Sequence, residues 1–132
     1  MKHIRKFNES KEEEISHIKE IVKDFADDYD LIEETTVFLS RLHHGNTGIF
    51  YFIYDYNNRT EHPNTILFSV VHSSKLEKSH RIQEINDGIN LLIERIKLMG
   101  FECSYSKIVS DSTHLLNRVR NLNQKNVYIK YE

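Results

Sequence analysis

Histidine and cysteine are the residue types in this chain that could hold a metal ion or act as nucleophiles. The sequence has 132 residues, of which eight are histidine and one is cysteine. The histidines are His3, His17, His43, His44, His62, His72, His80 and His114. Zinc sites need convergent ligands, usually at spacings such as H-E-x-x-H or in paired cysteines, and neither pattern occurs here. The sequence therefore predicts no metal site and no cofactor.

The single cysteine, Cys103, is the one candidate for nucleophilic catalysis together with a histidine. It alternates with Phe101 and Tyr105 in an apolar stretch, which is typical of a buried structural thiol. The sequence also lacks a glycine-rich phosphate loop and a G-x-S-x-G elbow. We therefore predict no catalytic residues and favour a non-enzymatic protein, with a small enzyme of unrecognised site as an open alternative.

Three cations, Lys75, Lys78 and Arg81, lie at the start of a predicted helix, where the helix dipole disfavours positive charge. A bound phosphate group would explain their placement, and a solvated lysine cluster is the alternative. Residues 9–34 carry eleven acidic side chains against three lysines, and such a segment would repel a polyanion. Nucleic-acid binding through these three residues is therefore our second functional prediction.

The predicted elements follow the periodicity of the apolar residues. Helical spacing predicts one helix that Ser10 and Glu13 cap and a second that begins near Ser74 or Ser79 and ends at Gly100. Runs of aromatic and β-branched residues predict strands. The predicted strands are 34–42, 49–56, 66–71, 101–109 and 127–131. A short third helix is predicted at 112–122, and a turn at 121–126 leads into the last strand.

The resulting order, α-β-β-β-α-β-α-β, predicts an α+β fold. Short connections favour antiparallel pairing, and the apolar stripes of the first two helices must be buried on the sheet. We expect a two-layer sandwich with a mainly antiparallel sheet and the helices on one face, formed by a single domain over residues 1–132. No apolar run approaches the ~20 residues of a membrane span, so we expect a cytoplasmic protein without a membrane partner.

The hairpin over residues 48–72 is predicted to be the centre of this sheet. Residues 49–56 are apolar on both faces, as in strands that are covered on both sides. One face carries Phe50, Phe52, Tyr54 and Tyr56. These rings could stack on nucleic-acid bases, pack under the helices or contact a protein. We interpret Tyr54, Tyr56 and, on the last strand, Tyr128 as interface residues for a protein partner.

The order α-β-β-β-α over residues 10–99, with lysines opening the last helix, is similar to the topology of the double-stranded RNA-binding domain. That family sets such lysines against phosphates, so the resemblance implies that Lys75, Lys78 and Arg81 contact nucleic acid. The chain departs from the family in its strongly acidic first helix and in the bulky Ile and Leu residues of its last helix. A nucleic-acid-binding module is thus the alternative function.

The first nine residues, Met1 to Glu9, read MKHIRKFNE. They resemble the short leaders of small proteins from tailed bacteriophages, which begin Met-Lys, carry Phe-x-Glu near position nine and direct internal proteins into the prohead. The resemblance implies a phage accessory protein, in the host cytoplasm or the virion, that is cut after Glu9. We predict a phage-type protein that binds another protein or self-associates. Val127–Tyr131 is predicted as an edge strand, which favours a homodimer.

Overall fold

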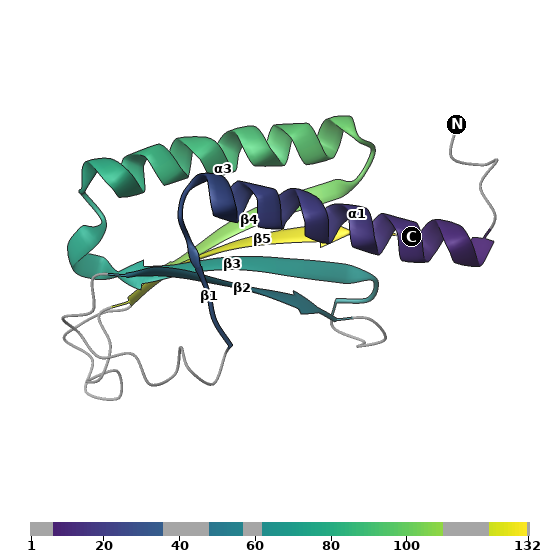
Figure 1. Ribbon diagram of the computed structural model, residues 1–132, viewed down its shortest axis with the longest axis horizontal. Coiled ribbons are helices and arrows are strands. Elements are labelled where there is room, and N and C mark those ends of the chain that lie inside the picture. Colours follow the sequence, from purple (N-terminus) through teal and green to yellow (C-terminus); the bar gives the residue numbers. More distant parts are fainter. Residues whose placement is uncertain (1–6, 36–47, 57–61, 110–121, 132) are drawn as a thin grey trace.

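The computed structural model describes residues 7–35, 48–56, 62–109 and 122–131. Its elements are α1 (Phe7–Asp28), β1 (Ile32–Glu33), β2 (Ile49–Asp55), β3 (Thr65–Ser73), the 3-10 turn η2 (Ser74–Leu76), α3 (His80–Leu98), β4 (Glu102–Val109) and β5 (Leu122–Lys130). The strands form one sheet, and α1 and α3 both lie on one face of it (Figure 1). The predicted two-layer α+β sandwich is confirmed. The helix predicted at 112–122 lies outside the described residues, apart from Leu122, which begins β5.

The sheet has the strand order β1-β2-β3-β5-β4 and is antiparallel except at one edge. There β1 runs parallel to β2, with Ile32 opposite Phe50. β1 precedes the strand predicted at 34–42; residues 34 and 35 are outside a strand, and residues 36–42 lie outside the described part of the chain. The chain turns at Asp30, whose φ is 56°, between the end of α1 and the start of β1. After this turn β1 runs alongside β2 in the parallel direction.

The last strand differs most from its prediction. β5 begins at Leu122, where the sequence predicted a turn, and it pairs with β3 on one side and β4 on the other. The prediction of an edge strand at Val127–Tyr131 is wrong, and so is the dimer contact expected from it. The physical reason is that the polar first half of β5 has inward side chains with buried partners, which outweigh its weak local preference for a strand.

The helix boundaries are partly as predicted. α1 begins at Phe7, so Ser10 lies within the helix and the predicted capping box is wrong, while Phe7 to Glu9 form its first turn. Ser79 is the N-cap of α3, and its Oγ accepts a hydrogen bond from the Ile82 amide at 3.2 Å. Gly100 has a φ of 96°, which confirms its predicted role as the stop after α3.

The main core fills the space between the helices and the sheet. Its buried side chains include Ile18, Val22 and Phe25 of α1, Ile82, Ile85, Ile89, Leu92 and Ile96 of α3, and Ile66, Phe68, Val70, Val127 and Ile129 of the sheet. Gly88 of α3 lies against the side chain of Tyr29. A Cβ at Gly88 would lie only 2.6 Å from Tyr29 Cζ, so this glycine lets the end of α1 pack against α3. Within the part of the chain that is described, no helix is long and apolar enough to cross a membrane.

Candidate functional site

The face of the sheet opposite the helices, called here the open face, carries three rows of side chains in register across four strands. The rows are Tyr54, Leu67, Tyr128 and Ser104; Phe52, Ser69, Asn126 and Ser106; and Phe50, Val71, Gln124 and Ile108. They follow from strand alternation, which sends every second side chain to this face. This face is therefore aromatic over β2 and polar over β4, and its side chains on β3, together with Phe50 and Asn126, are buried.

The predicted interface tyrosines are brought together on the open face through a histidine. The ring centroids are 4.9 Å apart for Tyr54 and Tyr56, 4.7 Å for Tyr56 and His62, and 5.2 Å for His62 and Tyr128. The last two rings are stacked, with 28° between their planes. We call these four residues the aromatic row. The sequence does not indicate this role of His62, because a lone histidine in a loop carries no signal of the strand that it will cover.

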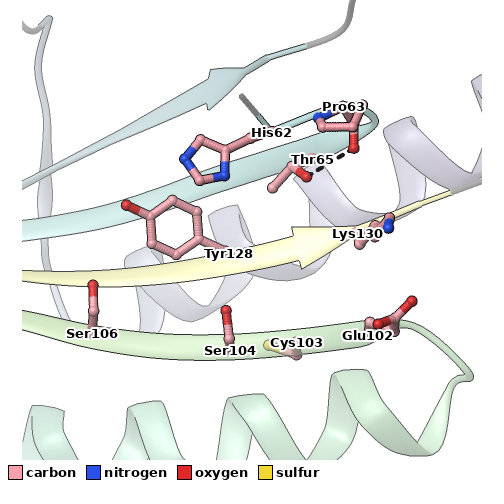
Figure 2. A pocket seen from close by; sticks show the side chains of 9 residues that line it. All are labelled: His62, Pro63, Thr65, Glu102, Cys103, Ser104, Ser106, Tyr128 and Lys130. Carbon is pink, nitrogen blue, oxygen red and sulfur yellow. Dashed lines mark hydrogen bonds between the residues drawn. The ribbon is translucent and has the colours of Figure 1, made fainter. Parts of the chain in front are cut away.

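His62 is placed by the turn that leads into β3. The Tyr56 amide donates to the Thr65 carbonyl at 2.9 Å, and the Thr65 hydroxyl donates to the Pro63 carbonyl at 3.1 Å. Asn64 adopts a φ of 55°, a conformation that asparagine tolerates better than most residues. This turn directs the imidazole back over the sheet toward Tyr128 (Figure 2).

A groove of about 490 Å³ lies beside the aromatic row. It is lined by His62, Pro63 and Thr65 before and at the start of β3, Tyr128 and Lys130 on β5, and Glu102, Cys103, Ser104 and Ser106 on β4 (Figure 2). Glu102 lies directly opposite Lys130 in the ladder, so the described lining of the groove carries one carboxylate and one ammonium. The groove therefore offers aromatic surface and hydroxyl groups without an excess of either charge.

Cys103 lines the groove and also packs against the core. Burial raises the pKa of its thiol to about 11, despite the opposing effect of Lys97. Because the thiolate is the nucleophile, Cys103 is poorly suited to covalent chemistry at neutral pH. Among the residues that the structure describes, no cluster of three or more His, Cys, Asp or Glu side chains could hold a metal ion.

The three cations predicted to bind phosphate lie around η2 and the start of α3, at the opposite end of β3 from the groove. Arg81 donates from Nη2 to the carbonyls of Tyr29 at 3.3 Å and Asp30 at 3.0 Å, so it ties the start of α3 to the end of α1. Lys75 and Lys78 are exposed. The structure thus gives Arg81 a structural role beside two solvated lysines.

A polar cluster that the sequence analysis missed lies at the end of β3 and is formed by His72, Glu77, Lys107, Asn123 and Lys125; we call it the buried cluster. Lys125 Nζ donates to His72 Nε2 at 2.7 Å and to Glu77 Oε1 at 3.1 Å. Glu77 also accepts from Asn123 Nδ2 at 2.8 Å and from Lys107 Nζ at 2.6 Å. His72 Nδ1 lies 2.8 Å from the Ser73 carbonyl, so Nδ1 carries the proton and Nε2 is the acceptor.

Burial governs the electrostatics of this cluster. It lowers the pKa of His72 and the pKa of Lys125, because both lose hydration when charged. Burial alone would raise the pKa of Glu77, but hydrogen bonds from Lys107, Asn123 and Lys125 outweigh it and hold that pKa at about 2. His72 and Lys125 are 0% and 1% exposed, so these two side chains are closed to a substrate, and their contacts with Glu77 hold the end of η2 against the sheet.

We expect acid to destabilise the protein through His72. The pKa of His72 in the folded protein lies below the ordinary 6.5, so near this pH the unfolded chain binds a proton that the folded protein does not bind. The free energy of unfolding therefore falls as the pH drops below about 6.5. Glu77 adds a further loss between its ordinary pKa of 4.5 and about 2. Urea unfolding at a series of pH values measures both effects.

Two glutamine variants test whether His72 causes the loss of stability near neutral pH. His72→Gln should reduce the slope between pH 7 and 5, because glutamine does not titrate. His80→Gln is the matched control, because the His80 side chain is 91% exposed and only faces Glu84 at 3.7 Å, and it should leave the slope unchanged. Equal slopes in the wild type and His72→Gln would contradict a neutral, buried His72.

Comparison with known proteins finds no relative, because no family model, curated protein or solved structure matches the chain.

Proposed function

We propose that the protein is a non-enzymatic binding protein that takes a segment of another protein along the groove of the open face. The observation that supports this most is the aromatic row, which lies beside the groove and contains all three predicted interface tyrosines. Tyrosine is enriched at protein interfaces because its ring buries apolar area while its hydroxyl group keeps a hydrogen-bond partner.

The chemistry of the groove suits a polypeptide better than a polyanion. Tyr128 and His62 offer apolar ring surface, while Ser104 and Ser106 offer hydroxyl groups that can donate to or accept from peptide groups. Among the described residues that line the groove, the facing pair of Glu102 and Lys130 gives no positive excess of the kind that nucleic acid requires. An extended segment with apolar and polar side chains would use both kinds of surface.

The titratable groups with shifted pKa values support binding rather than catalysis. Three of these groups bind one another within the protein, namely Lys125, His72 and Glu77. The raised pKa of the Cys103 thiol leaves little thiolate at neutral pH. A phage-type accessory role and a cytoplasmic setting belong to the same proposal. The first is supported by the leader-like sequence Met1–Glu9 and the second by the lack of a long apolar run.

A random peptide library tests this proposal without knowledge of the natural partner. We expect selection on the wild-type protein to enrich peptides whose affinity falls at least tenfold in Tyr128→Ala, because aromatic residues at the centre of an interface contribute about 2 kcal/mol or more. His62→Ala should have a similar effect, since it removes the ring stacked on Tyr128. Leu91→Ala is the control, because Leu91 is 65% exposed on α3, on the other side of the molecule.

Two outcomes would contradict the proposal. Enriched peptides that bind Tyr128→Ala and His62→Ala as well as the wild type would show that the groove is not the binding site. The second outcome is tight binding of duplex RNA, duplex DNA or single strands at low salt, lost when Lys75, Lys78 and Arg81 are all replaced by glutamine. That result would favour the nucleic-acid module instead.

A further inference from the structure

β4 is an edge strand of the described sheet, and within the described residues its outer side lacks the usual protection against pairing. It pairs with β5 over eight residues, from Glu102 opposite Lys130 to Val109 opposite Asn123, in an unbroken ladder. No strand in the described part of the chain pairs with its other side. Proteins usually block such an edge with proline, a bulge or outward charges. Residues 103–108 contain neither proline nor glycine, and the ladder has no bulge.

The side chains near this edge favour association. Tyr105 is 41% exposed and Ile108 is 54% exposed, so two large apolar groups of β4 reach solvent. The one charged side chain within residues 103–108 is Lys107, and its Nζ lies 2.6 Å from Glu77 Oε2. Because this ammonium is bound to Glu77 of its own molecule, it does not protect the edge strand from pairing with another strand.

We infer that β4 pairs antiparallel with β4 of a second copy about a two-fold axis at Tyr105. In that register Tyr105 faces its own copy, Ser104 faces Ser106, and Glu102 faces Ile108. Opposite residues then share a face of the sheet, as antiparallel pairing requires, and no like charges meet. Aromatic and hydroxyl pairs of this kind are among the favourable cross-strand contacts. The strand is therefore complementary to itself, which is why the partner is a second copy.

The pairing would also extend the open face. Glu102, Ser104 and Ser106 line the groove on its β4 side, so a second β4 beyond them would bring the grooves of the two copies together across the axis. Only this consequence rests on the proposed function. The dimer itself is measured without any peptide, so failure of one proposal can be told from failure of the other.

Sedimentation of the full chain tests the dimer. We expect a dimer in the wild type at several hundred micromolar, and a dissociation constant at least tenfold higher in Tyr105→Lys, which places two ammonium groups opposite each other on the axis. The control is Leu91→Lys, the same kind of change at an exposed site of α3, and it should leave the dimer intact. A wild-type monomer throughout the range, or a dimer that Tyr105→Lys does not weaken, would overturn the inference.

Disulfide crosslinking tests the register. In a Cys103→Ser background, Tyr105→Cys should form a covalent dimer on mild oxidation, because facing residues lie about 5 Å apart and within disulfide reach. Ile108→Cys in the same background should not, because the two copies of residue 108 would be about 20 Å apart along the strands. Crosslinking at residue 108 rather than 105, or at neither, would overturn the proposed pairing.

Discussion

Replacing Ile89 by aspartate should lower the free energy of unfolding by about 4 kcal/mol or more, enough to unfold a domain of ordinary stability. Ile89 is 1% exposed and lies in the core between α3 and the sheet. The substitution removes a packed aliphatic side chain and places a carboxylate where water cannot reach it. Urea unfolding followed by far-ultraviolet circular dichroism measures the loss.

Leu91 provides the matched control on the same helix. It is 65% exposed, only two residues away, so Leu91→Asp makes the same chemical change on the solvent side of α3. We expect a change within about 0.5 kcal/mol, as for most surface substitutions. If Ile89→Asp unfolded at the wild-type urea concentration, α3 would not pack on the sheet through this stripe.

The sequence predicts those features of the fold that depend on the local spacing of apolar residues. The stripe of α3 from Ile82 to Ile96 is buried as its spacing indicates, and Gly100 ends the helix region because it can adopt a positive φ. The alternation in β2 places Ile49 and Tyr51 in the core and Tyr54 on the open face. These features depend on residues close together in the chain, so a single sequence contains their signal.

The other features of the fold and of the candidate site depend on contacts between residues that are distant in the sequence. Residues 122–126 read as a turn because Asn, Gln and Lys are poor strand formers, yet Lys125 is buried on the same side as Val127 and bonds to His72, 53 residues away. The strand order is equally nonlocal, since β5 is inserted between β3 and β4. At the candidate site the tyrosines were identified by type, but only the fold brings Tyr128 and His62 together.

Glu77→Gln should lower the free energy of unfolding by about 2–3 kcal/mol. It removes the one carboxylate of the buried cluster and leaves the ammonium of Lys125, which is 1% exposed, without a counter-charge. Breaking a fully buried pair from one side costs about 3–5 kcal/mol, and the cost here is smaller because the Glu77 side chain is 25% exposed. Urea unfolding at neutral pH gives the value.

Lys125→Met distinguishes an uncompensated charge from a general loss of contacts. It removes the buried ammonium itself, while Glu77 keeps its bonds to Lys107 and Asn123. We therefore expect a loss of about 1–2 kcal/mol, smaller than that of Glu77→Gln, because no charge loses its counter-charge but the buried Nε2 of His72 loses its donor. The double variant should be more stable than Glu77→Gln alone, since it has no unpaired charge to bury. A double variant that loses the sum of both single effects would show that Glu77 stabilises the fold through contacts other than the charge of Lys125.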